Sequence, residues 1–376
     1  MQSRAAVLHA IPATRPYAQS RPLVLETVEL DPPGPGEVLV RIAAAGLCHS
    51  DLSVINGDRP RPVPMALGHE ASGIVERLGD GVTDLRPGDH VVMVFVPSCG
   101  HCAPCAEGRP ALCEPGAKAN ASGELLAGGR RIHLNGAPVS HHIGVSAFGE
   151  FAVVSRRSLV PIDREVPLDH AALFGCAVLT GVGAVVNTAA IRPGQTVAVI
   201  GLGGVGLSAV LGALGAGAAE IIAIDVNPDK LAIARELGAT AVFDAADPDT
   251  SGAVRERTRG GVHAAIETAG VPAAFDLAYQ VTRRGGQTVT ASLANPAARL
   301  SLQQVGLVAE ERTIRGSYLG GGVPSRDIPA YIALFRQGRL PVDRLLTSSG
   351  PLDDINAAFD SLAEGKTVRH IIRMEV

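Results

Sequence analysis

The second half of the chain alternates short apolar runs with segments that have one apolar face. From about residue 178, the pattern predicts a strand over Thr196–Ile200, a helix over Gly203–Gly215 and a second strand over Glu220–Asp225. A further helix is predicted over Asp229–Leu237, because Gly238 commonly marks a helix end. Apolar strands separated by helices indicate a parallel sheet covered on both faces. The alternation continues with strands at Ala264–Glu267 and Gly286–Thr290.

The first part of the chain has a different pattern, with short β-like runs separated by turns. Turn signals at Pro32–Gly34 and Arg86–Asp89 indicate a mostly β domain. After about Gly320, two amphipathic helices and a last strand are expected to return to this domain. We expect one domain over residues 1–178, completed by 321–376, and a second over residues 179–320. The β-like runs are Glu37–Ile42, Ser72–Leu78, His90–Val96 and Glu150–Val154, and the late elements are Ile328–Arg336, Leu352–Glu364 and Val368–Arg373.

Length and composition agree with two packed domains and narrow the possible partners. The chain has 376 residues, of which 46% are hydrophobic and 19% charged, which suffices for packed cores. A net charge of -4 without a basic tail makes nucleic acid a poor partner. The first ten residues hold a shorter apolar run than a secretory signal needs, so we expect a cytoplasmic protein. The uncharged stretch Pro193–Ala219 could span a bilayer by length, but its many glycines favour a buried strand and helix, not a membrane segment.

A glycine-rich turn follows the first apolar strand of the second domain. Gly201, Gly203, Gly204, Val205 and Gly206 fit the pattern G-x-G-x-x-G between a predicted strand and a predicted helix. In this context the glycines allow a tight turn and a close approach of the backbone to a pyrophosphate, which binds at the helix N-terminus. The alternative, a glycine-rich structural turn, explains fewer of these features. The turn therefore predicts dinucleotide binding.

An acidic residue ends the next strand at the expected spacing. Asp225 stands where a carboxylate binds the adenosine ribose hydroxyls, and it would repel a 2′-phosphate. Lys230 lies close by in the sequence and could also bond the ribose. We therefore expect NAD rather than NADP as the coenzyme.

Four of the six cysteines lie close together. Cys99, Cys102, Cys105 and Cys113 have the spacing C-x2-C-x2-C-x7-C. Four thiolates on one loop can close a tetrahedral structural zinc site. An iron–sulfur cluster is an alternative, although the fourth spacing differs from the ferredoxin pattern, and disulfides are a third. Zinc is favoured, because the chain is long enough to build a core without disulfides.

The two remaining cysteines and one histidine form a second possible set. Cys48, Cys176 and His69 have the composition of a catalytic zinc site, in which the fourth position is left to water or substrate. Spacing alone does not bring these residues together, and an isolated cysteine is more often part of the core.

The order of these motifs resembles that of the zinc-dependent alcohol dehydrogenases of the medium-chain dehydrogenase/reductase superfamily. Cys48-His-Ser-Asp, Gly68-His-Glu, the four-cysteine loop, Gly175-Cys-Ala and the glycine-rich turn carry the resemblance over nearly the whole chain. The stretch between Cys113 and Phe148 is similar to the liver-type and glutathione-dependent formaldehyde dehydrogenase (class III) branch. The resemblance implies a GroES-like catalytic domain, a Rossmann NAD domain, two zinc ions per chain and a homodimer.

The resemblance also implies roles for single residues. Cys48, His69 and Cys176 match the catalytic zinc ligands, with Glu70 behind the metal and Asp51 holding the ring of His69. The other matches are Ser50, the hydroxyl that takes the substrate proton; His49, beside the pyrophosphate; Thr180, on the nicotinamide side; Arg369, a phosphate-binding residue; and Phe95, His142 and Ile143, which would line the substrate channel.

Two departures from the family pattern bear on the activity. Ser53 stands where the liver-type proton relay often ends in histidine, so His49 or water would end the relay. The loop Gly57–Arg61 carries arginines where the formaldehyde dehydrogenase branch has acids that bind glutathione. We therefore expect NAD-linked oxidation of free primary alcohols, medium-chain or aromatic. S-(hydroxymethyl)glutathione oxidation and a non-catalytic zinc and NAD-binding role are the alternatives. Arg59 and Lys118 could favour an anionic substrate, or be solvated surface charges.

Overall fold

The computed structural model of this protein describes residues 1–374 and divides into two compact units. Unit 1 holds Met1–Cys176, Val323–Ile332 and the chain from Leu346 onward. Unit 2 holds Ala177–Gly322 and Ala333–Leu345. Each unit has a sheet and a hydrophobic cluster of its own.

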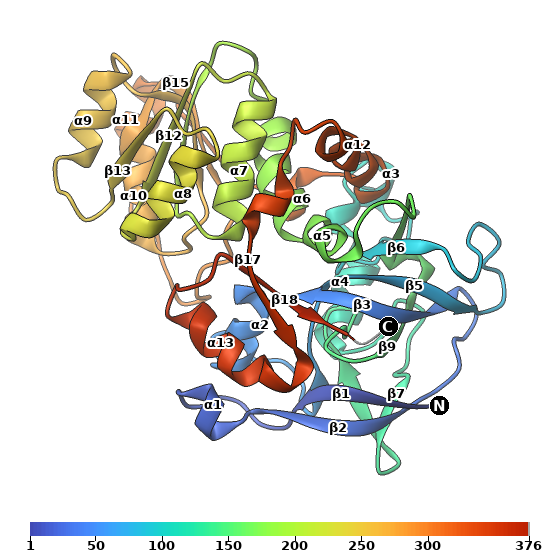
Figure 1. The fold of residues 1–376 in the computed structure, drawn as a ribbon. Coiled ribbons are helices and arrows are strands. Elements are labelled where there is room, and N and C mark those ends of the chain that lie inside the picture. The colour runs from blue at the N-terminus through green and yellow to red at the C-terminus, as the bar shows by residue number, and fades with distance from the viewer. Residues whose placement is uncertain (375–376) are drawn as a thin grey trace. The chain divides into compact units, whose positions relative to one another are not determined.

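Unit 2 is built on a six-stranded parallel sheet in the order β13-β12-β11-β14-β15-β16 (Figure 1). The strand order reverses between β11 and β14, as in doubly wound Rossmann folds. Ligands of such folds bind at this reversal, beyond the carboxyl ends of the strands. The strands are β11 (Thr196–Ile200), β12 (Glu220–Asp225), β13 (Ala241–Asp244), β14 (Val262–Glu267), β15 (Thr282–Thr290) and β16 (Thr313–Gly316).

Helices pack on the sheet of unit 2 because the connections between its parallel strands must cross over it. One helix, α7, packs on β11 and β12, and another, α10, packs on β11, β14 and β15. Between the sheet and the helices lie buried apolar side chains such as Ile200, Ile222 and Val281. The helices are α6 (Ala177–Gly183), continued by a π-helical turn (Ala184–Thr188), α7 (Gly204–Gly215), α8 (Pro228–Glu236), α9 (Thr250–Arg257), α10 (Pro272–Val281) and α11 (Gln304–Ala309).

Unit 1 contains a small closed barrel with the strand order β1-β2-β7-β8-β4. Strand β1 closes it by pairing with β2 along its whole length and with β4 through Val7 and Leu8. Apolar side chains, among them Val28, Ile132 and Val139, form a buried cluster here. The strands are β1 (Gln2–Leu8), β2 (Leu23–Leu30), β4 (Met65–Ala66), β7 (Ile132–Leu134) and β8 (Ala137–His141).

The second sheet of unit 1 brings the C-terminal strand next to strands from the first part of the chain. Its order is β10-β6-β5-β3-β18-β17, and β9 also pairs with β3. The C-terminal strand β18 pairs antiparallel with β3, with Ile371 opposite Gly46. The backbone of Leu47 then donates to the carbonyl of His370. The strands are β3 (Glu37–Gly46), β5 (Glu70–Leu78), β6 (His90–Met93), β9 (Phe151–Ser155), β10 (Leu159–Ile162), β17 (Leu346–Pro351) and β18 (Arg369–Arg373).

The remaining helices are short and join the strands of unit 1. They are α1 (Tyr17–Ser20), α2 (His49–Ile55), α3 (Ala103–Ala106), α4 (Glu114–Ser122), α5 (Leu168–Ala172) and α13 (Ile355–Ala363), while α12 (Pro324–Arg336) runs from unit 1 into unit 2. Turns of 3-10 helix lie at Pro110–Leu112, Arg156–Ser158, Leu173–Gly175, Leu319–Gly321, Val342–Leu345 and Leu352–Asp354.

The expected α/β class is confirmed, and most predicted elements agree closely with the observed ones. Two predicted strands, Thr196–Ile200 and Glu220–Asp225, match β11 and β12 residue for residue. The uncharged stretch at Pro193–Ala219 contains β11 and α7, as expected for a buried strand and helix. Between residues 1 and 374, no single helix is long and apolar enough to cross a membrane; only the bent pair Leu168–Gly175 and Ala177–Thr188 passes together, by length and composition alone.

Candidate metal centre and active site

Three potential metal ligands converge in unit 1 from distant parts of the chain. Cys48 follows the end of β3 and caps α2, His69 directly precedes β5, and Cys176 follows the 3-10 turn after α5. All three residues are buried, and one ligand atom from each lies within 4.8 Å of the others. Two thiol groups and one imidazole at this separation can occupy three corners of a tetrahedral zinc site.

The hydrogen bonds of His69 show which of its nitrogens is left for a metal. Its Nδ1 lies 3.0 Å from Asp51 Oδ1, in a buried hydrogen bond. Its Nε2 is buried and has no hydrogen-bond partner among the described residues. Buried polar atoms without partners are rare and costly, so an orphaned imidazole nitrogen beside two thiols is the mark of a ligand site. The residues therefore fit a zinc ion held by Cys48, His69 and Cys176.

The surroundings of these ligands are strongly polar although they are buried. A hydrogen bond with Cys176 and the charge of Arg369 hold the pKa of the Cys48 thiol well below its usual value. Burial raises the pKa of Glu70 to about 7. The guanidinium of Arg369 lies 3.6 Å from Glu70 and donates to the carbonyl of Leu47. Glu70 and Arg369 thus form a buried ion pair close to Cys48 and Cys176.

The residues after Cys48 begin helix α2. Asp51 accepts hydrogen bonds from the backbone of Cys48, at 3.2 Å, and of Gly68, at 3.3 Å, so its carboxylate is fixed on both ligand segments. Ser50 is half-buried and His49 is exposed, both in the first turn of α2. Ser53 donates to the carbonyl of His49 at 2.8 Å, which occupies its hydroxyl within the helix.

Two of the expected substrate-wall residues touch the ring of His69. The rings of Phe95 and His142 each lie 5.4 Å from it, centroid to centroid, in edge-to-face contacts. Ile143, the third, is also buried. Burial lowers the pKa of His142, which favours its neutral form. The structure thus groups an aromatic ring and an imidazole around His69.

The four-cysteine loop closes on itself around α3 and the start of α4. The sulfur atoms of Cys99, Cys102, Cys105 and Cys113 lie within 4.8 Å of one another, and all six cysteines are free thiols. Burial raises the pKa of the Cys113 thiol, and backbone N–H groups of Cys99 and Gly116, which donate to its Sγ at 3.1 and 3.4 Å, partly offset this effect. A set of four sulfurs leaves no open position, so a zinc ion held there would be structural.

The glycine-rich turn of unit 2 has the geometry that its spacing predicts. Gly201 has φ +89°, and a Cβ on Gly206 would lie 1.8 Å from the carbonyl oxygen of Gly201. A Cβ on Gly203 would meet no protein atom within 4 Å, so nothing in the protein itself requires glycine there. Close approach by a bound molecule explains that glycine, as in dinucleotide sites.

Of the other expected coenzyme residues, Asp225, Lys230 and Thr180 lie in unit 2, whereas Arg369 lies in β18 of unit 1, beside Glu70. Asp225, at the end of β12, accepts hydrogen bonds from the backbone of Leu202, at 2.6 Å, and of Asn227, at 2.9 Å. Lys230 is half-buried on α8, and Thr180 is buried on α6. Asp225 therefore shapes the glycine-rich turn in addition to presenting a carboxylate at the carboxyl edge of the sheet.

Glu267 was not among the site residues expected from the sequence. This buried carboxylate ends β14 and accepts hydrogen bonds from the backbone of Gly270 and from the hydroxyl groups of Thr290 and Ser292, at 2.6 to 2.7 Å. It joins the segments that follow β14 and β15 at the edge where dinucleotides bind. An acidic residue ending an otherwise apolar strand was the signal that could have identified it.

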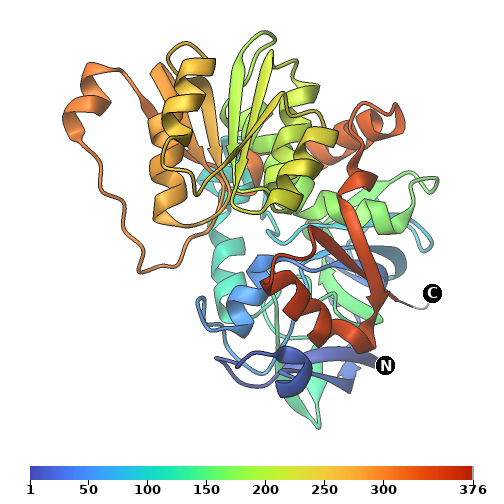
Figure 2. The same cartoon turned by 60° about the vertical axis from the view of Figure 1, so that its left-hand side comes forward.

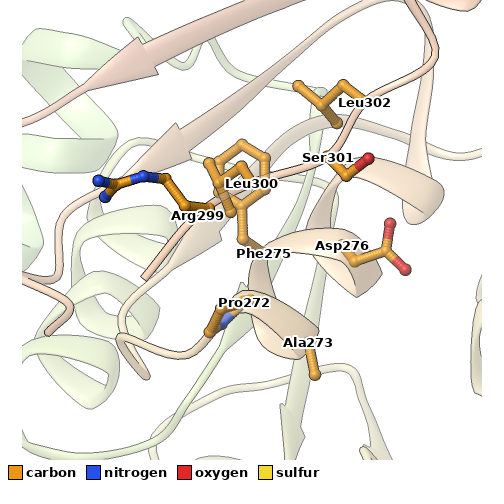
Figure 3. A pocket seen from close by; sticks show the side chains of 8 residues that line it. All are labelled: Pro272, Ala273, Phe275, Asp276, Arg299, Leu300, Ser301 and Leu302. Carbon is orange, nitrogen blue, oxygen red and sulfur yellow. The ribbon is translucent and has the colours of Figure 1, made fainter. Parts of the chain in front are cut away.

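A pocket of about 340 Å³ lies elsewhere in unit 2 (Figure 3). It is formed by the first part of α10, including Phe275 and Asp276, and by the segment Arg299–Leu302. None of the proposed metal ligands or turn glycines lines it. Leu300 and Leu302 in its wall are also largely exposed to solvent, at 52% and 36%.

Comparison with known proteins agrees with this geometry. An alcohol dehydrogenase GroES-like domain model matches residues 34–164, and a zinc-binding dehydrogenase model matches residues 204–337. The chain is 37% identical to an S-(hydroxymethyl)glutathione dehydrogenase of Escherichia coli over 99% of its own length and 100% of that protein.

Solved structures are similar over the full length of the chain. An alcohol dehydrogenase zinc-binding domain protein from Burkholderia ambifaria has a TM-score of 0.94 at 36% identity, with 100% of both chains covered. Benzyl alcohol dehydrogenase from Acinetobacter calcoaceticus has a TM-score of 0.93 at 32% identity, also with 100% of both chains covered. With its two ligand sets and its Rossmann turn, this chain belongs to the zinc-dependent alcohol dehydrogenase family of the medium-chain dehydrogenase/reductase superfamily.

Proposed function

We propose that the protein is an NAD-dependent dehydrogenase that converts primary alcohols, medium-chain or aromatic, reversibly to aldehydes. The convergence of Cys48, His69 and Cys176, with His69 Nε2 left without a partner, carries the proposal. A zinc ion in such a three-ligand site acts as a Lewis acid toward an alcohol or carbonyl oxygen. The redox chemistry belongs to the coenzyme, and the protein binds, orients and handles the proton.

The side chains around the ligands would divide that work. Asp51 holds the ring of His69 through Nδ1, so that Nε2 faces the metal position. We assign the removal of the substrate's hydroxyl proton to Ser50, at the start of α2, with His49 or water passing it on. Phe95, His142 and Ile143 would form an apolar and aromatic wall for the substrate, from which water is excluded. The positive charge of Arg369 would balance the negative charge of Glu70 beside the ligands.

A substrate panel tests this proposal directly. We expect NADH formation, followed by absorbance, with benzyl alcohol and with straight-chain alcohols such as hexanol. The relatives named for S-(hydroxymethyl)glutathione favour a second candidate, so formaldehyde should be assayed with and without glutathione. A kcat/KM for formaldehyde plus glutathione above that of every free alcohol would favour this second function. If no substrate is turned over, a non-catalytic binding role would replace both.

The coenzyme preference gives a separate prediction. In Asp225→Gly we expect the ratio of kcat/KM with NADP to that with NAD to rise at least about tenfold, because a negative charge that repels the 2′-phosphate is removed. Steady-state kinetics with both coenzymes measures this ratio. Asp229→Asn removes an exposed carboxylate in the first turn of α8 and should leave the ratio unchanged. An unchanged ratio in Asp225→Gly would remove the assigned role.

We also propose that the protein is a homodimer formed through unit 2. Strand β16 ends the sheet and is largely exposed, so its outer edge can pair with a second copy of itself about a twofold axis. The segment that precedes β16 in the chain, which includes α11, projects from the rest of unit 2 in Figure 2. It carries Leu300, Leu302, Val305 and Val308, the last two exposed at 72% and 71%. A patch of this kind commonly marks a protein interface.

The cytoplasmic location of the protein stays a prediction from its sequence.

Charges placed on this segment should separate the subunits. We expect the double variant Val305→Asp and Val308→Asp to shift the mass in light scattering from two chains to one chain of 38.6 kDa. The cost of burying two carboxylates in an interface is the reason. Leu214→Asp, at an apolar residue of α7 that is 46% exposed, is the control and should stay dimeric. A variant that keeps the mass of the wild type would locate the interface elsewhere.

A further inference from the structure

The carboxylate of Asp51 faces two imidazole rings, of which the metal-binding His69 is only one. Oδ1 of Asp51 lies 3.0 Å from Nδ1 of His69 and 3.1 Å from Nδ1 of His142. Exposure of the Asp51 side chain is 0%, and that of the two histidine side chains is 1% and 2%. Oδ1 also accepts from the backbone of Gly68. One buried oxygen atom is therefore surrounded by three potential donors.

Apart from Asp51, no described group faces Nδ1 of His142 as a hydrogen-bond partner. The contact of His142 Nδ1 with Asp51 lies outside ideal hydrogen-bond direction, and no other group in residues 1–374 bonds that nitrogen. A buried ring nitrogen is costly unless a charged or polar atom faces it. Asp51 is the group that faces it, so the position of each ring depends on the same carboxylate.

The backbone around His142 is held in an uncommon conformation. Ile143 has φ +42° and Ser146 has φ +57°, in the left-handed region that side chains disfavour, and most strongly a β-branched one. The N–H of His142 donates to Ser146 Oγ at 2.8 Å, and the N–H of Val145 donates to the carbonyl of His142. Strained turns of this kind persist where the surroundings over-determine them, commonly at functional sites. Here the turn places the His142 ring against Asp51 and His69.

The rings themselves complete the arrangement. His142 meets the ring of His69 edge to face at 88°, and Phe95 meets it at 89°. His69 is thereby confined between two rings, while Asp51 holds its Nδ1. An aromatic hydrocarbon side chain at position 142 would keep the ring contact but would remove the second imidazole nitrogen that faces Asp51.

We propose that His142 is a positioning residue for the metal centre, which shares the carboxylate of Asp51 with His69 and so keeps His69 Nε2 directed at the metal. The inference rests on the proposed zinc site of Cys48, His69 and Cys176. It goes beyond a channel-lining role for His142, because it concerns retention of the metal and not contact with substrate. Partners that orient a ligating histidine typically affect metal affinity by about 10–100-fold.

Three variants of the full-length protein separate the contribution of His142 Nδ1 to metal retention from that of the ring. His142→Phe keeps a ring but no donor. His142→Asn places an amide nitrogen near the position of Nδ1, and His142→Gln places one near the position of Nε2. Zinc release is followed with the chromophoric chelator 4-(2-pyridylazo)resorcinol, and the four-cysteine site serves as an internal reference. Cobalt replacement provides a second readout, because the absorption of cobalt in a thiolate and imidazole site reports ligand geometry.

We expect His142→Phe and His142→Gln to release one zinc ion about 10–100-fold faster than the wild type, while the second ion leaves at the wild-type rate. His142→Asn should restore slow release and the wild-type cobalt spectrum. If His142→Phe does not fold, the comparison of Asn with Gln decides the matter. Release at wild-type rates from all variants, or equal loss in Asn and Gln, would overturn the inference. A wild-type protein that binds a single zinc ion would instead refute the metal assignment itself.

Discussion

In His69→Ala, kcat for alcohol oxidation should fall at least about a thousandfold, while the affinity for NADH stays close to that of the wild type. Removing the imidazole deletes one of three protein ligands and takes away the ring that Asp51 orients. Lewis-acid activation by a metal contributes several kcal/mol to the barrier, and each 1.36 kcal/mol corresponds to a factor of ten in rate. Cys48→Ala should behave in the same way, because it removes another ligand of the same set.

Three measurements on His69→Ala separate loss of chemistry from loss of the fold. Zinc content should fall from two ions per chain to one, since the four-cysteine site is independent of His69. NADH binding, followed by fluorescence, should persist because the glycine-rich turn belongs to unit 2. His133→Ala is the matched control, as this partly exposed histidine of unit 1 pairs with Asp31 and touches no ligand. Retained turnover in both ligand variants would eliminate the catalytic metal site.

In Arg131→Leu we expect the free energy of unfolding to fall by about 3–5 kcal/mol, since the change leaves a buried carboxylate unpaired. Glu37 begins β3 and its side chain is 1% exposed, and Arg131 binds both of its oxygens, at 2.8 and 3.2 Å. The hydrogen bond to Glu37 raises the pKa of Arg131 above its usual value. Arg131 directly precedes β7, so the pair joins the barrel to the second sheet of unit 1.

Urea unfolding followed by circular dichroism measures this loss. The double variant Glu37→Gln and Arg131→Leu should recover most of it, because the charge and its partner are then removed together. Arg4→Leu provides the contrast, since it breaks an exposed ion pair with Asp353 and should cost less than about 1 kcal/mol. If Arg131→Leu is as stable as Arg4→Leu, the pair does not hold the barrel and the sheet together.

The strands of unit 2 were predictable because their pattern is local. Buried parallel strands are apolar along their whole length and are flanked by glycine and by polar helix starts, so β11 and β12 could be delimited exactly. Strand ends where the chain leaves the sheet were predicted less well. The strand expected over His90–Val96 ends at Met93, because Val94 donates to the carbonyl of Ser158 and the chain turns toward the ligands. That turn is what brings Phe95 to His69.

The ends of two late helices also differ from the prediction. The helix expected over Ile328–Arg336 begins earlier, at Pro324, because proline is tolerated in the first turn of a helix. The helix expected from Leu352 begins at Ile355, after a 3-10 turn. Helix ends depend on capping contacts, which the apolar spacing does not reveal.

The sequence by itself determined the sites whose parts lie within one turn or loop. Four cysteines within a short segment must lie near one another, and the spacing of Gly201, Gly203 and Gly206 between a strand and a helix specifies a tight turn. Chain connectivity restricts these distances, whatever the rest of the fold does.

Only the tertiary structure decided which distant residues share a site. Cys48, His69 and Cys176 meet because the end of β3, the start of β5 and the 3-10 turn after α5 lie at the same place. Asp51 contacts both His69 and His142, and Glu37 pairs with Arg131, far along the chain. The physical reason is that such contacts depend on how buried surfaces pack, and many pairings of apolar strands would bury similar area. The residue types and the order of the motifs therefore predicted the chemistry of the ligands, while packing determined which side chains orient them.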